Sequence, residues 1–211
     1  EEWKKETYAH LKDKPVSPWR IAYELNRFID DKTLFIIEDT TPERIMNIFS
    51  KNLKLDEYCS YLSERAGFLG WSLGFSIGVK LGKPDKKVIC ILGDGSFLYG
   101  NGFSALWTVA HYNIPILFLI DNNSCFSSTK SVHLEYAKRT GNDKIIGHDI
   151  KEPIIDFTHA AKAVGIDSIS IDEPENLREA LEKGLQNIKR GKAFLIDIKT
   201  LDTSSFLTSW L

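Results

Sequence analysis

Two short polar segments hold the residues of this chain best suited to chemistry. Asp94 stands between Gly93 and Gly95 directly after an apolar run, and Asn123 follows the next apolar run. A carboxylate and a neutral amide oxygen make a poor cage for Ca²⁺ but a reasonable half-shell for Mg²⁺, which phosphate oxygens and water would complete. The flanking glycines let the backbone turn tightly and a ligand approach closely. The pattern therefore predicts a Mg²⁺ site that takes a diphosphate.

Hydroxyl groups that suit a phosphate occur in matching places. Thr40 and Thr41 follow the apolar segment 33–37, just before a helix expected to begin at Pro42, and helix N-termini favour phosphate. Ser96 offers another hydroxyl. Taken singly, Gly-Asp-Gly reads equally well as a turn and Thr-Thr as a helix N-cap. The expectation of a phosphate site therefore rests on their joint occurrence.

A glycine-rich segment, residues 67–78, is the second unusual stretch. Each glycine inside a helix costs about 1 kcal/mol relative to alanine, so repeated glycines call for a reason. We expect Gly74 and Gly78 to serve close helix packing. Gly67 and Leu69 lie at the start, where the backbone could reach a ligand.

Apolar segments and helical patterns alternate along the chain. Strands are predicted at 33–37, 88–92, 114–120, 168–171 and 193–198, and helices at 18–29, 65–81, 103–112, 154–164 and 174–189. The polar residues 124–150 are predicted to form a long loop with some helix. Continuously apolar strands between helices indicate an α/β fold with a doubly wound, mostly parallel sheet and helices on both faces. Ligands bind at the carboxyl ends of such strands, where residues 38–41, 93–96 and 121–125 would fall.

Composition excludes several classes of protein. The 211 residues suffice for one good core and are few for two ordinary domains. A net charge of −2 argues against a nucleic-acid partner, and no apolar run of membrane length or signal peptide occurs. Cys59, Cys90 and Cys125 lie far apart, so we expect neither a disulfide framework nor a zinc site. Cys90 is expected in the core, and the setting is expected to be reducing and cytoplasmic.

We expect three segments along the chain. Residues 1–14 read as a lead-in helix, residues 15–201 as one domain, and residues 202–211 as an apolar tail that docks onto a partner. The chain begins at Glu1 and its only methionine is Met46, which suggests a fragment or a processed product.

Together these motifs resemble a known family. The run GDGS, followed by SALWTVAHYNIP and then Asn122-Asn123, is similar to the thiamine diphosphate-binding signature of the benzoylformate decarboxylase and acetolactate synthase branch. The preceding GFLGWSLGFSIGVKLGKPDKKVICIL and the following IIDFTHAAKAVGI and GKAFLIDIKT resemble the rest of the C-terminal diphosphate-binding domain. The resemblance covers about residues 15–201.

The resemblance implies a role for each matching residue. The side chains of Asp94 and Asn123 and the backbone oxygen of Cys125 would hold Mg²⁺. The Gly67 carbonyl would meet the aminopyrimidine, and Leu69 would bend the cofactor from beneath. The thiazolium ylid would attack a 2-oxo acid and serve as the electron sink for loss of CO₂. The implied cofactor-binding residues are Thr40, Thr41, Gly67, Leu69, Gly93, Gly95, Ser96 and Asn123, and the implied metal ligands are Asp94, Asn123 and Cys125.

The chain departs from the family pattern in two places. The separation of Asp94 from Asn123 is about two residues longer than usual, and we expect Gly100-Asn101-Gly102 to carry the extra length as a loop. Residues 124–127, Ser-Cys-Phe-Ser, replace a commoner glycine-containing run, so the wall nearest the substrate is expected to be unusual.

The family's activating glutamate is not expected in this chain. It belongs to a separate pyrimidine-binding domain and acts across a subunit interface. Glu38 and Glu64 do not match its context and are interpreted as structural. The resemblance thus implies no catalytic residue here, and a homo- or hetero-oligomer in which a pyrimidine-binding domain or subunit completes the site.

Three hypotheses remain open on this basis. The leading one is the diphosphate-binding part of an enzyme acting on small 2-oxo acids, either a carboligase or a simple decarboxylase. The others are a non-catalytic regulatory or scaffold subunit and an unrelated metal-dependent phosphate-binding protein. Among the histidines, His111 is interpreted as a helix-end or surface residue, whereas His133 and His148 lie where a substrate contact is possible.

Overall fold

A computed structural model describes residues 2–38, 60–62, 68–142, 144–202 and 204. Within them lies one parallel sheet of six strands in the order β2-β1-β3-β4-β6-β5. The strands are β1 (Thr33–Glu38), β2 (Ser60–Leu62), β3 (Lys87–Gly93), β4 (Ile116–Asn122), β5 (Asp167–Ile171) and β6 (Phe194–Lys199). The predicted α/β class with a parallel sheet is confirmed, and β2 was not predicted.

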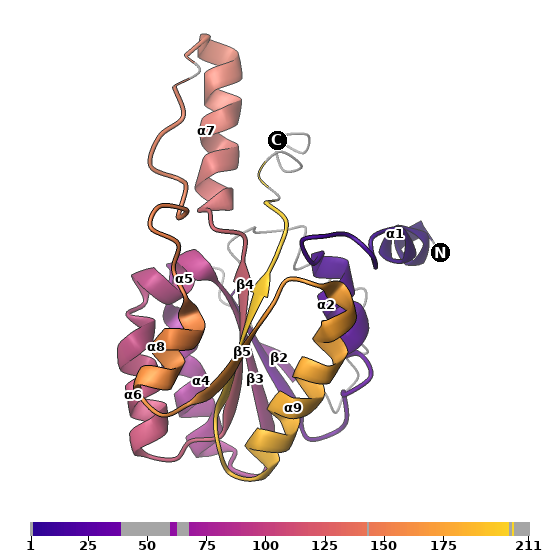
Figure 1. The fold of residues 1–211 in the computed structure, drawn as a ribbon, viewed down its shortest axis with the longest axis vertical. Coiled ribbons are helices and arrows are strands. Elements are labelled where there is room, and N and C mark those ends of the chain that lie inside the picture. The colour runs from indigo at the N-terminus through magenta and orange to yellow at the C-terminus, as the bar shows by residue number, and fades with distance from the viewer. Residues whose placement is uncertain (1, 39–59, 63–67, 143, 203, 205–211) are drawn as a thin grey trace.

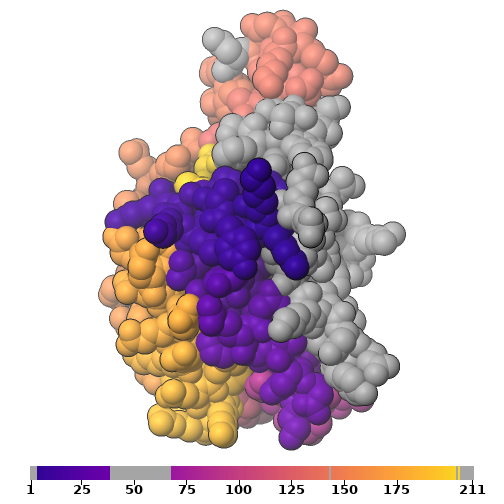
Figure 2. Space-filling view, turned by 90° about the vertical axis from the view of Figure 1, so that its right-hand side faces the viewer, coloured from indigo at the N-terminus to yellow at the C-terminus, as the bar shows by residue number. Residues whose placement is uncertain are grey.

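Helices cover both faces of the sheet (Figure 1). They are α1 (Glu2–Ala9), α2 (Pro18–Leu25), α4 (Trp71–Gly82), α5 (Asp94–Tyr99), α6 (Gly102–His111), α7 (Ser127–Thr140), α8 (Phe157–Ala163) and α9 (Leu177–Lys189), with the 3₁₀ turn η1 (Pro174–Asn176) before α9. Figure 2 shows the indigo N-terminal segment lying directly on the body of the molecule. None of the described helices is long and apolar enough to cross a membrane.

The strands build two cores because their side chains alternate between the faces. On β3, Ile89 and Ile91 belong to the core under α2 and α9, whereas Val88, Cys90 and Leu92 belong to the core under α4, α6 and α8. All five are at least 96% buried, so β3 is apolar on both faces. Cys90 lies in the core, as predicted.

Capping residues account for where α2 and α8 begin. The side chain of Ser17 accepts a hydrogen bond from the Arg20 N–H at 3.2 Å, and Pro18 takes the first helical position. The side chain of Asp156 accepts from the His159 N–H at 3.0 Å, so α8 begins at Phe157, later than predicted. The helix expected from Pro42 lies outside the described residues.

The junction of α5 and α6 differs from the prediction. The Gly100-Asn101-Gly102 segment is a tight turn between two helices, and α5 was not predicted at all. A Cβ on Gly70, which has a φ of 91°, would lie 2.0 Å from the Gly100 Cα. The two backbones therefore touch, and neither position has room for a side chain.

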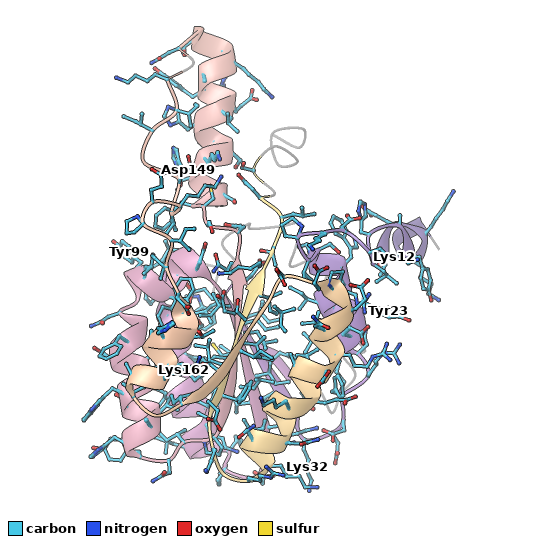
Figure 3. All side chains as sticks on the ribbon, in the orientation of Figure 1. Lys12, Tyr23, Lys32, Tyr99, Asp149 and Lys162 are labelled. Carbon is cyan, nitrogen blue, oxygen red and sulfur yellow. The ribbon has the colours of Figure 1, made fainter. Side chains whose placement is uncertain are left out.

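Residues 124–150, predicted as a loop with some helix, instead contain the 14-residue helix α7. We call residues 127–150 the arm: α7 and the segment that returns beside it stand clear of the sheet layers (Figure 1). The arm returns to the body at Asp149, which Figure 3 labels at its base. Gly141, with a φ of 70°, ends α7.

The close helix packing predicted for the α4 glycines does not occur among the described residues. There, a Cβ on Gly74 or Gly78 would meet no atom within 4 Å, and both positions are exposed. Nearby on the same helix, Phe75 is 44% and Leu81 is 65% exposed. Within the described residues, α4 thus presents a bare apolar face rather than a tight helix contact.

Candidate cofactor and metal site

The parallel register brings the two polar segments to one edge of the sheet. Gly93, the last residue of β3, pairs with Asp121 of β4. Asp94 then begins α5, and Asn123 directly follows β4. The chain reaches this geometry because both strands run the same way, so their carboxyl ends meet at a common edge.

Asp94 is a buried carboxylate, and one of its oxygens accepts no hydrogen bond from the described residues. Its side chain is 2% exposed, and Oδ1 accepts a hydrogen bond from the Gly95 N–H at 2.7 Å. Among the described residues, Oδ2 has no hydrogen-bond partner. Burial, with the charge of Asp121 adding to it, raises the pKa of Asp94 to about 7, although the N–H groups of Gly95, Ser124 and Cys125 oppose the rise. A cation at Oδ2 would satisfy this oxygen and favour its charged form.

The segment after β4 folds into a turn that carries the other two expected ligands. The Asn123 Oδ1 accepts a hydrogen bond from the Cys125 N–H at 3.0 Å, and Ser124 has a φ of 54°. An amide oxygen has two lone pairs, so Asn123 Oδ1 keeps one for a metal. Cys125 is buried and forms an antiparallel bridge with Asp149 of the arm.

A hydrogen-bond network joins the end of β4 to the end of β6. The Asn122 Nδ2 donates to Asp197 Oδ1 at 2.8 Å, while its Oδ1 accepts from the Ser124 N–H at 3.2 Å. Thr200 donates to Asp121. Burial raises the pKa of Asp121 to about 6, with the Thr200 hydrogen bond opposing the rise. Asp197 and Thr200 were missed as supports because they stand far from this segment in the sequence.

Ser96 provides a second unmet group. It lies in the short helix α5 and is fully buried, and its Oγ has no hydrogen-bond partner in the part of the chain that the structure describes. A buried hydroxyl without a partner is costly, and a phosphate oxygen would supply one. The unmet oxygens of Asp94 and Ser96, two residues apart, therefore fit a metal-bound diphosphate.

The remaining expected residues are placed less completely. Leu69 lies in the turn before α4 and is half-buried. Thr40, Thr41 and Gly67 lie outside the described residues, as does Glu64. Among the described residues, no group of three or more His, Cys, Asp and Glu side chains could hold a metal ion.

Glu38 is structural, as interpreted from the sequence. It is the last residue of β1 and is 4% exposed. Its carboxylate accepts hydrogen bonds from the backbone N–H groups of Gly70 and, at 2.9 Å, Ser72. Both oxygens are thus committed to the first turn of α4.

The histidines lie apart from this chemistry or pair with each other. His111 is exposed at the end of α6, where its ring stacks on Trp107 with centroids 4.8 Å apart. His133 Nδ1 and His148 Nε2 of the arm are 2.9 Å apart. A substrate contact by either arm histidine stays a prediction.

The fold is an α/β domain with a parallel sheet, and its acid and amide at neighbouring strand ends lie at the edge where such domains bind ligands. Residues 44–198 match the family model "Thiamine pyrophosphate enzyme, C-terminal TPP binding domain". The chain belongs to this family, which confirms the resemblance found in the sequence.

Individual relatives agree with the family. The chain is 32% identical over 202 residues to a probable acetolactate synthase large subunit of Methanococcus aeolicus, covering 93% of this chain and 31% of the relative. It is 28% identical over 173 residues to a benzoylformate decarboxylase of Pseudomonas aeruginosa, covering 81% and 30%. The chain therefore spans about a third of the length of these relatives.

Solved structures share the fold. A thiamine diphosphate-dependent 4-hydroxybenzoylformate decarboxylase of Rhodococcus jostii superposes with a TM-score of 0.76 at 26% identity. That match covers 91% of this chain and 34% of the other. The doubly wound fold predicted from the sequence is that of this family.

Proposed function

We propose that this chain binds the diphosphate end of thiamine diphosphate through Mg²⁺, as part of an enzyme acting on small 2-oxo acids. The observation that carries the proposal is the buried, unpartnered Oδ2 of Asp94, next to the turn that holds Asn123. A buried charge is retained in proteins where it is paired or coordinates a metal. The chain's family supports the cofactor.

The roles of the residues follow from their chemistry. Asp94 and Asn123 would hold Mg²⁺ through side-chain oxygens and Cys125 through its backbone carbonyl, while Ser96 would donate to a phosphate oxygen. Thr40 and Thr41 would add phosphate donors, Gly67 would meet the aminopyrimidine, Leu69 would support the cofactor, and Gly93 and Gly95 would leave room for it. When bound, thiamine diphosphate supplies the electron sink that loss of CO₂ from a 2-oxo acid requires.

A second domain or subunit is proposed to supply the activating glutamate. Glu38 accepts backbone hydrogen bonds from Gly70 and Ser72 through its two oxygens, which supports a structural role for this buried acid at the start of α4. The bare face of α4, with the open positions Gly74 and Gly78 beside exposed Phe75, is a surface that a partner would cover. We propose that the pyrimidine-binding domain or subunit docks there, within a homo- or hetero-oligomer.

The reaction is proposed to be a decarboxylation, a carboligation or both. A relative named as an acetolactate synthase supports carboligation, and two named as benzoylformate-type decarboxylases support simple decarboxylation. Product analysis with pyruvate separates them, because a carboligase forms acetolactate and a simple decarboxylase forms acetaldehyde. No turnover by the native assembly over a broad panel of 2-oxo acids would favour a scaffold subunit instead.

The clamp is tested by calorimetric titration of the native assembly with thiamine diphosphate in the presence and absence of Mg²⁺. We expect Asp94→Ala and Asn123→Ala to abolish the Mg²⁺-dependent part of binding, because each removes one metal ligand. Asp167→Ala, at an exposed position of β5, is the matched control and should bind like the unaltered chain. Unchanged Mg²⁺-dependent binding by Asp94→Ala would refute the assignment.

A further inference from the structure

Phe126 belongs to the 124–127 segment that departs from the family pattern, and the sequence assigned it no individual role. It follows Cys125 directly and precedes α7. A Cβ built on Gly95 would lie 2.5 Å from Phe126 Cε1 and 2.6 Å from Cδ1. The edge of the Phe126 ring therefore rests on Gly95, in the first turn of α5, and no other residue type fits at position 95 while the ring stays there.

The backbone around Phe126 is fastened to the returning segment of the arm. The Phe126 N–H donates to the His148 carbonyl at 2.8 Å, and the Ile150 N–H donates to the Ser124 carbonyl at 2.8 Å. These two bonds flank the antiparallel bridge between Cys125 and Asp149. The turn that carries the expected metal ligands is thus one side of a short two-stranded ladder.

The Phe126 carbonyl accepts hydrogen bonds from the first turn of α7. It accepts hydrogen bonds from the Lys130 N–H at 2.9 Å and from Thr129 Oγ1 at 3.0 Å. The Lys130 ammonium reaches Asp149 at 3.2 Å and Asp202 at 2.9 Å, which ties α7 to the ladder and to the segment after β6. The backbone of Phe126 is therefore fixed, and the side chain has a defined seat on α5.

The ring packs against the helix that begins with Asp94, and it adds an apolar contact to the polar one between the Asp94 carboxylate and the N–H groups of Ser124 and Cys125. Asp94 and Gly95 are consecutive residues of α5, and Asn123 and Cys125 stand just before Phe126. A Mg²⁺ ion needs near-ideal octahedral geometry, so its ligands must be held at fixed separations. A rigid contact between the two segments that supply these ligands meets that need.

We propose that Phe126 is a positioning residue, which holds the Asn123–Cys125 turn against α5 so that the metal ligands converge. The proposal rests on the proposed function, since it gives Phe126 a purpose only if Asp94 and Asn123 share a metal. Phe126 itself would touch neither the metal nor the cofactor. Its effect is transmitted through the contact with Gly95.

The test measures Mn²⁺ binding by electron paramagnetic resonance in the native assembly with saturating thiamine diphosphate. Phe126→Ala should weaken Mn²⁺ binding about tenfold, because the turn loses its seat while all ligands remain. Phe126→Leu, which still fills the space on Gly95, should stay within about threefold of the unaltered chain. Tyr136→Ala, which removes a 52% exposed ring from the same arm, is the matched control and should bind normally.

A double-mutant cycle separates positioning from general loss of structure. Gly95→Ala alone should weaken Mn²⁺ binding, because the new Cβ displaces the ring. In the Phe126→Ala background the penalty of the same change should be clearly smaller, since the ring is gone and only the room that Gly95 leaves for the cofactor is reduced. Penalties that simply add, or Mn²⁺ binding by Phe126→Ala equal to that of the unaltered chain, would overturn the proposal.

The two proposals fail in different ways. If the unaltered assembly binds neither Mn²⁺ nor thiamine diphosphate, the proposed function fails and the role of Phe126 falls with it. If the unaltered assembly binds both and the cycle shows no coupling, only the role of Phe126 is refuted. Should Phe126→Ala not fold, Phe126→Leu and Gly95→Ala still report on the contact: Gly95→Ala must weaken binding and Phe126→Leu must largely keep it.

Discussion

Replacing Asp94 with asparagine should stabilise the cofactor-free chain while removing a ligand of the proposed metal site. Burial, followed by the charge of Asp121, raises the pKa of Asp94 from 3.8 to about 7. Because the folded-state value lies above the unfolded one, ionisation of Asp94 opposes folding. This opposition is absent below about pH 4, grows as the pH rises and is complete above about pH 7.

The magnitude follows from the size of the pKa change. One pKa unit corresponds to about 1.4 kcal/mol, so a rise of about three units gives a penalty of about 4 kcal/mol at pH 8. Asparagine removes the charge but buries an amide N–H₂ without a partner at the Oδ2 position, which costs about 1–3 kcal/mol. We therefore expect a net gain of about 2 kcal/mol for Asp94→Asn at pH 8.

The assay is urea unfolding of the cofactor-free chain at pH 5 and pH 8. The difference in unfolding free energy between Asp94→Asn and the unaltered chain should shrink on going to pH 5, where Asp94 is mostly protonated. Asp121, whose pKa is also raised by burial, is present in both chains, so only its repulsion of the ionised Asp94, which is part of the raised pKa of Asp94, enters the difference. Asp167→Asn, at an exposed position, is the control and should show no such dependence.

With Mg²⁺ and thiamine diphosphate added, we expect the unaltered chain to be more stable than Asp94→Asn. A ligand that binds only the folded state stabilises it in proportion to its affinity, so the unaltered chain should gain stability in the native assembly and Asp94→Asn should not. The reasoning is refuted if cofactor-free Asp94→Asn is less stable than the unaltered chain at pH 8, or if the difference is the same at pH 5.

Three further changes test other parts of the structure. Glu38→Ala should lower the free energy of unfolding by about 2–4 kcal/mol in urea titrations, because two backbone N–H groups lose a charged acceptor; a loss under 0.5 kcal/mol would contradict the capping role. Gly74→Ala should raise the stability of the isolated chain by about 1 kcal/mol and weaken its assembly with the partner in sedimentation experiments; unaltered assembly would refute docking on that face. Ser17→Ala should cost about 1 kcal/mol by the same urea titration, and no change would show that the N-cap of α2 is dispensable.

Strands and strand ends could be predicted because their signals are local. The β3 and β4 segments are continuously apolar, which in a chain of alternating helices has one good explanation, a sheet covered on both faces. Once that was inferred, the carboxyl-end rule placed Asp94 and Asn123 at a common edge, and the structure gives them adjacent strand ends. The burial of Asp94 and its unmet Oδ2 are properties of packing and needed coordinates.

Features that depend on distant contacts could not be predicted. Helix α5 begins with Asp94 and Gly95, both poor helix formers, and it ends where Gly100 meets Gly70 from another part of the chain. Helix α7 is polar and stands away from the core, so it lacks the apolar periodicity that marks other helices. Its end did carry a local signal, since Gly141 follows two basic residues in the last turn.

Direct contacts join α4, with its exposed apolar face, to the helix that carries Asp94. Glu38 at the end of β1 caps α4, and Gly70 at the start of α4 touches Gly100 at the end of α5. The helix with the exposed apolar face is therefore joined by direct contacts to the helix that carries Asp94. A partner that covered α4 would lie beside the candidate cofactor site, so one assembly would bury the exposed face and bring the cation to the Asp94 oxygen. The contacts between the two helices are thus consistent with the proposed docking on α4.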